Sequence, residues 1–108
     1  GIKWTGTSLA IYNWVRALTL PFPGAFTFWD EKKVTVWDSE LPEGYRARLN
    51  SMPGEVIDIL NGRGVVVATA DNCILVKTVE IDGQQMGGDE FARNFTVATG
   101  TIFRGENK

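Results

Sequence analysis

The spacing of apolar residues predicts a helix near the start of the chain. Four of them recur at the i, i+3, i+4 and i+7 spacing of one helix face: Ile11, Trp14, Val15 and Leu18. Thr7 or Ser8 can cap the first turn, because a side-chain oxygen there accepts from an otherwise unpaired backbone N–H. We therefore expect an amphipathic helix from residue 8 or 9 to residue 18.

A stiff corner follows this helix in the sequence Leu20-Pro21-Phe22-Pro23-Gly24. Pro21 disfavours the helical conformation for the residue before it, each proline fixes its own φ, and Gly24 permits a positive φ. The corner therefore holds Phe22 at a set angle. Two interpretations stay open: Phe22 is a core residue of a structural corner, or it forms one wall of a ligand pocket.

After the corner the pattern changes to that of strands. Apolar runs at residues 25–29 and 34–38 flank the charged residues 30–33, which predicts an antiparallel hairpin. In one register Trp29 and Trp37 share a face, where they either pack together or form an exposed pair that stacks on bases. The hairpin supplies the first two strands of a sheet.

Evenly spaced strands with turn signals fill the second half of the chain. Asn61-Gly62 is a strong hairpin signal, and Asp89 can cap a short helix at residues 90–95. The expected strands lie at residues 54–60, 65–69, 73–80, 84–86 and 99–104. This order predicts a mainly β domain with two short helices, a small OB-like and partly open β-barrel preceded by the amphipathic helix.

Composition limits the chemistry that the chain can perform. Its 108 residues suffice for one domain, and 44% of them are hydrophobic. The absence of histidine removes the usual general base and the usual metal ligand. The single cysteine, Cys73, lies in an apolar run and is expected to be a buried thiol, so no disulfide forms within the chain. We expect no catalytic residue and no metal site here.

Charge and hydropathy also bear on partners. No apolar run approaches the roughly 20 residues of a membrane span, so we expect no membrane partner. A chain that forms no internal disulfide suits the cytoplasm, so we expect a cytoplasmic protein. The formal net charge of −2 disfavours nucleic acid as a partner without excluding it. Arg46 and Arg48, in the loose segment 39–53, are expected to be solvated charges. Arg16, four residues after Tyr12, is either solvated or part of an anion site.

Several blocks together resemble a known family. They are Ile2-Lys3-Trp4, Ile11-Tyr12-Asn13, Val15-Arg16-Ala17-Leu18, Pro21-Phe22-Pro23-Gly24-Ala25-Phe26-Thr27, Lys33-Val34-Thr35-Val36-Trp37-Asp38, Pro53-Gly54-Glu55-Val56-Ile57 and Gly100-Thr101-Ile102-Phe103. These blocks resemble the C-terminal domain of folate-dependent formyltransferases, a family that includes methionyl-tRNA formyltransferase and sugar-nucleotide N-formyltransferases. The block Val34-Thr35-Val36-Trp37 is most similar to the module that acts on UDP-4-amino-4-deoxy-L-arabinose.

The resemblance implies that substrate positioning and catalysis belong to different domains. Residues 8–105 would form an OB-like substrate-positioning domain, residues 1–7 a linker from an N-terminal catalytic domain, and residues 106–108 a tail. In the family, catalysis belongs to that Rossmann-like N-terminal domain, which uses an Asn, a His and an Asp with 10-formyltetrahydrofolate. This chain alone would hold no cofactor and be inactive. By position, the residues that would face the substrate nucleotide are Arg16, Pro21, Phe22, Pro23 and Gly24.

The substrate stays open between alternatives. The acidic balance of the chain favours an amino-sugar nucleotide over tRNA, since a domain that grips tRNA should be basic. One alternative is the tRNA-binding C-terminal domain of a methionyl-tRNA formyltransferase. Another is a free-standing OB-like module that binds single-stranded nucleic acid through exposed aromatic residues. A purely structural interaction domain is the third.

Overall fold

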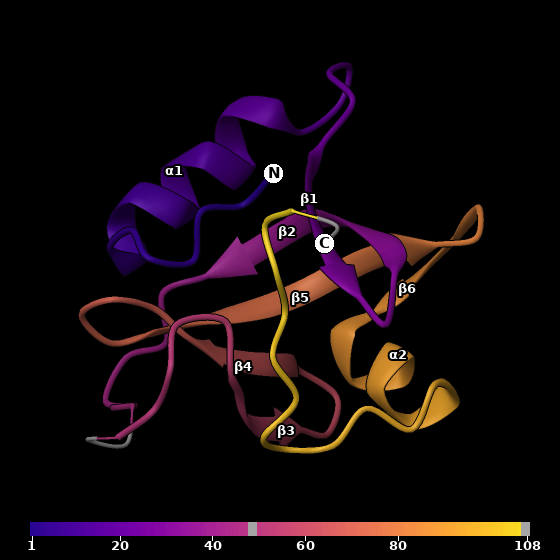
Figure 1. Cartoon of the computed structure of the whole chain (residues 1–108). Helices are drawn as coiled ribbons and strands as arrows, with labels where there is room; N and C mark the ends of the chain where they lie inside the picture. The colour runs from indigo at the N-terminus through magenta and orange to yellow at the C-terminus, as the bar shows by residue number, and fades with distance from the viewer. Residues whose placement is uncertain (48–49, 107–108) are drawn as a thin grey trace.

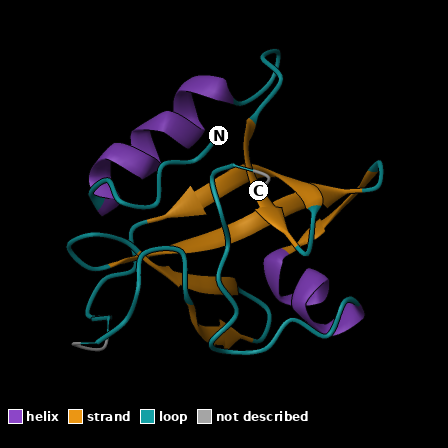
Figure 2. Cartoon of the chain, in the orientation of Figure 1, coloured by secondary structure: helices purple, strands orange, loops and turns teal. Residues whose placement is uncertain are grey.

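The computed structural model describes residues 1–47 and 50–106 of the chain. A six-stranded sheet lies at its centre, with two short helices beside it (Figures 1 and 2). The helices are α1 (Ser8–Leu18) and α2 (Gly88–Asn94). The strands are β1 (Ala25–Trp29), β2 (Lys32–Glu40), β3 (Val56–Leu60), β4 (Gly64–Ala68), β5 (Cys73–Ile81) and β6 (Gln84–Gly87). The prediction of a mainly β domain with two short helices is confirmed.

The sheet is antiparallel throughout and remains open. Its strands follow the order β1-β2-β5-β4-β3, and β6 pairs with β5. The expected strand at residues 99–104 is wrong, because this segment makes only two isolated bridges. One joins Arg104 to Phe28 of β1, and the other joins Ile102 to Glu55, just before β3. The segment therefore spans the gap between the two edge strands, as the yellow trace in Figure 1 shows, and gives a partly open barrel.

Strand β4 is buried at all five positions because both faces of the sheet are covered there. On one face Val65 and Val67 belong to the main core. On the other, Val66 and Ala68 belong to a smaller cluster that Tyr45 covers. The Tyr45 hydroxyl donates to Asp58 Oδ2 at 2.6 Å, which fixes the covering loop. This explains why a continuous apolar run, rather than an alternating one, forms the strand.

Helix α1 begins and ends as predicted. The Thr7 side chain accepts a hydrogen bond from Ala10 N at 3.1 Å, which caps the first turn. Ile11 and Val15 are buried, and Leu18 is half-buried against the core. Trp14 is the exception: it belongs to the apolar face by spacing, yet 46% of it is exposed. The core of this domain therefore covers only part of the apolar face that the sequence spacing predicts for α1.

Residues 1–7 pack into the domain. Ile2 and Trp4 are buried in the main core. Ile2 N donates to Phe26 O at 2.6 Å, and Trp4 Nε1 donates to Thr27 Oγ1 at 2.9 Å. Thr27 Oγ1 in turn donates to Arg104 O at 2.8 Å, so the first residues, β1 and the last described segment are tied together.

The first hairpin is tighter than expected. Its turn consists of Asp30 and Glu31, both with positive φ as a two-residue type I′ turn requires, and β2 begins at Lys32. The expected sharing of a face by Trp29 and Trp37 is wrong. The ring of Trp29 packs edge-on against two phenylalanines of the α2 region, whereas Trp37 lies beyond the end of β1, because Ala25 pairs with Val36.

Asp89 acts inside α2 rather than at its cap. Gly87 is the N-cap residue and provides no side-chain bond. The Asp89 carboxylate accepts from Gly62 N at 2.7 Å and from Arg93 Nη1 at 3.0 Å. The Gly62 amide, with Arg93 assisting, lowers the pKa of Asp89 below its usual value. This carboxylate ties α2 to the β3–β4 turn.

Candidate substrate-binding groove

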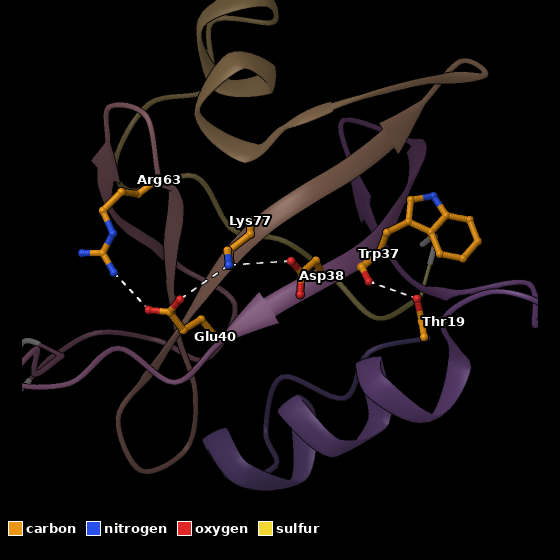
Figure 3. Close-up of polar contacts among 6 residues, drawn as sticks. All are labelled: Thr19, Trp37, Asp38, Glu40, Arg63 and Lys77. Atoms are coloured by element: carbon orange, nitrogen blue, oxygen red, sulfur yellow. Dashed lines mark hydrogen bonds and ion pairs between the residues drawn. The ribbon is translucent and has the colours of Figure 1, made fainter.

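The end of α1 faces the sheet across an open groove of about 460 Å³. We call it the α1–β2 groove. Its residues come from the helix end, from the middle of β2, and from the neighbouring strands β5 and β6: Val15, Arg16, Thr19, Leu20, Trp37, Asp38, Ser39, Thr78 and Gln85. Figure 3 shows Thr19 and Trp37 at this junction, where the Thr19 hydroxyl donates to Trp37 O at 3.4 Å.

A pair of irregularities in the β2–β5 ladder shapes the groove wall. Val36 pairs with Val79 and Asp38 with Thr78, so Trp37 has no partner on β5. The next pair joins Ser39 to residue 76, which restores the register. This bulge shifts the alternation of the strand, so that Ser39 rather than Asp38 is buried. Trp37 is held in place by donating from Nε1 to Glu80 Oε1 at 3.0 Å.

Arg16 is the cation that the groove leaves available. Its side chain is exposed, and its guanidinium carbon lies 5.4 Å from the ring centroid of Tyr12, which confirms the expected i, i+4 pair. None of the ion pairs among the described residues involves Arg16. An exposed guanidinium that takes part in no ion pair can bind a phosphate by donating two parallel N–H hydrogen bonds.

Four charged side chains beside the groove pair with one another. Figure 3 shows a chain of contacts in which Lys77 Nζ lies 3.7 Å from Asp38 Oδ2 and 3.6 Å from Glu40 Oε1. Arg63 Nη2 lies 3.0 Å from Glu40 Oε2. These side chains are partly exposed, so each pair contributes little to stability. Within this set two cations face two carboxylates. Glu80, which accepts from the Trp37 indole, is a further carboxylate beside the groove, and Arg16 is the exposed cation that lines it.

Uncharged polar groups complete the groove. The Ser39 hydroxyl is buried and has no hydrogen-bond partner among the described residues. Buried hydroxyls are normally paired, so this one is an exception, and it lies beneath the surface of the groove wall. Thr78 and Gln85 add a hydroxyl and an amide to the same wall. The groove thus offers one cation, the Asp38 carboxylate that pairs with Lys77, and neutral donors and acceptors, a set that can bind an anionic ligand with hydroxyl groups.

The corner that follows α1 lies next to this groove. Gly24 has a φ of +91°, and its backbone packs against Thr35 and the Trp37 ring. Phe22 is 56% exposed, so it is not a core residue, and Pro21 and Pro23 are exposed as well. Leu20 lines the groove and Phe22 is not among its lining residues. Gly24 therefore supports Trp37, which lines the same groove as Arg16, and the Phe22 side chain is exposed outside that groove.

Sequence reasoning missed the strand side of the groove. Trp37, Ser39, Thr78 and Gln85 come from three strands, and a bulge sets their direction. No spacing in the sequence brings them together. Of the two arginines in the segment 39–53, Arg46 is exposed, and Arg48 lies outside the described residues.

The described residues contain no group of three side chains that could hold a metal ion. The Cys73 thiol is buried among apolar side chains, which raises its pKa. Neither α1 nor α2 is long and apolar enough to span a membrane.

Comparison with known proteins decides the family. Residues 1–96 match the family model described as "Formyl transferase, C-terminal domain". The chain belongs to this family. Its relatives include the protein named methionyl-tRNA formyltransferase from Natranaerobius thermophilus, which is 32% identical over 99 residues, covering 91% of this chain and 30% of the relative.

Two further relatives carry the same name. That from Desulforamulus reducens is 31% identical over 102 residues, covering 94% of this chain and 31% of the relative. That from Ruminiclostridium cellulolyticum is 31% identical over 100 residues, covering 92% of this chain and 31% of the relative. The chain therefore spans somewhat under a third of the length of these relatives.

Proposed function

We propose that this chain is the C-terminal domain of a methionyl-tRNA formyltransferase and that it helps to bind the tRNA. The observation that carries the proposal is the unpaired Arg16 at the α1–β2 groove, in a domain whose relatives bear this name. A separate catalytic domain, preceding this chain in the full-length protein, would transfer the formyl group from 10-formyltetrahydrofolate to the amino group of the methionyl residue. This chain would position the tRNA and take no part in bond making.

The chemistry of the groove suits an RNA backbone. Arg16 would pair with a phosphate, the group to which guanidinium geometry is best matched. Thr78 and Gln85 can exchange hydrogen bonds with ribose hydroxyls, which RNA carries at every nucleotide. The corner at Phe22 would lie along the same strand of the nucleic acid, where an exposed ring can stack on an unpaired base.

The net charge of −2 does not oppose this proposal. The net charge sums residues over the whole chain and does not say where they lie. What a phosphate meets is the local potential, and the exposed Arg16 contributes a cation at the groove itself. The net charge of the whole chain does not show the local charge at the groove. For that reason the net charge favoured the amino-sugar nucleotide.

A two-substrate assay on the full-length protein tests the proposal. With 10-formyltetrahydrofolate present, the protein is offered methionyl initiator tRNA in one reaction and a UDP-amino-sugar in another. We expect formylation of the methionyl-tRNA and none of the sugar nucleotide. Formylation of the sugar nucleotide alone would overturn the proposal and restore the amino-sugar hypothesis.

A further inference from the structure

A second groove lies on the other side of α1, between the helix and the first residues of the chain. It has a volume of about 340 Å³ and is lined by Gly1, Lys3, Gly6, Ala10, Ile11 and Trp14. We call it the N-terminal groove. Apart from the Lys3 side chain its lining is apolar or glycine, and Figure 1 shows the first residues running beside α1.

Trp14 is the largest exposed apolar side chain in this groove. Its spacing places it on the apolar face of α1, yet 46% of it is exposed. Single exposed apolar side chains are common, but this one shares its spacing with core residues and lines an apolar groove, so covering it would remove further apolar area from water. The Lys3 ammonium group adds a polar rim, as contact surfaces between proteins usually have.

The start of the chain is fixed beside this groove. Ile2 N donates to Phe26 O at 2.6 Å, and the Trp4 indole donates to Thr27 Oγ1 at 2.9 Å. Gly6 N donates to Lys3 O at 2.9 Å, which turns the chain so that α1 runs back along its first residues. A polypeptide joined to Gly1 therefore leaves the domain directly from the lining of the groove.

We infer that the N-terminal groove is the docking surface for the catalytic domain that precedes this chain in the full-length protein. This inference rests on the proposed function. The family is defined as the C-terminal domain of formyl transferases, and the matched relatives are about three times as long as the matched region. The missing part would be tethered at Gly1, within reach of Trp14.

Because the two domains would belong to one chain, a small apolar contact is sufficient to keep them docked. A domain joined through a short linker is present at an effective concentration on the order of millimolar, so a contact that would be weak between separate molecules is occupied. Burying the exposed part of Trp14 then fixes the orientation of the two domains. Arg16 lies two residues further along the same helix, so this docking would also set the position of the α1–β2 groove relative to the catalytic domain.

The direct test is the solvent access of Trp14 with and without the rest of the protein. Full-length protein and the 108-residue chain are both labelled with 5-fluorotryptophan, and Trp14→Phe assigns the Trp14 fluorine resonance in each. Broadening by a dissolved nitroxide reports access. We expect strong broadening in the 108-residue chain and loss of most of it in the full-length protein. Equal broadening in both would overturn the inference.

A matched pair of variants supplies the second readout. Leu9 is 57% exposed on the same helix but does not line the groove. In the full-length protein, Trp14→Ala should speed cleavage by proteinase K at the junction before Gly1, whereas Leu9→Ala should leave the rate unchanged. Equal rates for Trp14→Ala and the wild-type protein would count against docking. Protection of Trp14 that grows with the concentration of the 108-residue chain would overturn the inference in favour of a second copy.

Neither readout contains tRNA or a formyl donor. Trp14 protection without formylation of methionyl-tRNA would retain the docking surface and reject the proposed substrate. Formylation without protection would reject the docking surface and retain the substrate.

Discussion

Gly24 packs directly against the ring of Trp37. A Cβ atom at Gly24 would lie 3.0 Å from Trp37 Cζ3 and 2.6 Å from Thr35 Cγ2. The corner after α1 and the bulge in β2 are therefore held together at one point. Because Trp37 forms a wall of the α1–β2 groove, the shape of the groove depends on a glycine outside it.

Gly24→Ala should destabilise the domain by about 2–4 kcal/mol, since it combines an unfavourable positive φ with crowding against two side chains. Gly44→Ala is the matched control. Gly44 also has a positive φ, of +72°, but no atom lies within 4 Å of its Cβ position, so a loss of about 1–2 kcal/mol is expected. Urea denaturation measures both. Equal losses would show that contact with Trp37 costs nothing.

Much of this fold was accessible from the sequence because local rules agree with tertiary packing. The Thr7 cap, the helix Ser8–Leu18 and the uniformly apolar β4 required nothing beyond propensity, spacing and turn residues. Local expectations failed at the Asp89 cap and at the length of the first hairpin turn, and others failed over long-range pairing. The segment around Ile102 touches two different strand edges, once each, and no local pattern encodes such a path.

The residues of the candidate site also divide into those that the sequence indicated and those that it did not. Arg16 and Gly24 could be singled out because a helix end and a proline-rich corner leave clear signals. Trp37 and Ser39 could not, because a bulge in β2 decides which of its residues face the groove. A single extra residue in a ladder reverses the alternation, and sequence alternation alone gives no position for it.

Replacing Trp4 and Trp14 by alanine should lower the free energy of unfolding by different amounts. Trp4 is 5% exposed and hydrogen-bonded to Thr27, so Trp4→Ala should cost about 3–5 kcal/mol in the 108-residue chain. Trp14→Ala in the same chain should cost less, about 1–2 kcal/mol, since nearly half of the Trp14 side chain is already exposed. Thermal or urea unfolding compares them. A large loss for Trp14→Ala would mean that this domain itself depends on that side chain.

Asp89 should make stability depend on pH. Its pKa is lowered in the folded state by the Gly62 amide and by Arg93, so its stabilisation is present above the unfolded value of about 3.9 and is lost as the pH falls through the folded pKa. Asp89→Asn should therefore be less stable than the wild type at pH 7. The two free energies of unfolding should converge on acidification below about pH 4. A constant difference across the whole pH range would contradict this role.

Cys73 should be unreactive in the folded protein. It is 1% exposed, and burial raises the pKa of its thiol, so both access and thiolate are lacking. Reaction with a thiol reagent such as DTNB should be slow in buffer and fast in denaturant, and it should follow the unfolding equilibrium. Rapid labelling of the native protein would show that the cluster around Cys73 opens locally.

The central claim is that Arg16 binds an RNA phosphate at the α1–β2 groove. Arg46, exposed and outside the groove, provides the matched control. Arg16→Lys separates charge from the paired geometry of the guanidinium, and it should recover only part of the affinity.

The measurement is the dissociation constant of the full-length protein for methionyl initiator tRNA as a function of salt concentration. We expect Arg16→Ala to weaken binding about tenfold, which corresponds to about 1.4 kcal/mol, and Arg46→Ala to leave it unchanged. The slope of log K against log salt should fall by about one for Arg16→Ala, as loss of one phosphate contact requires. An Arg16→Ala protein with the affinity and salt slope of the wild type would contradict the account.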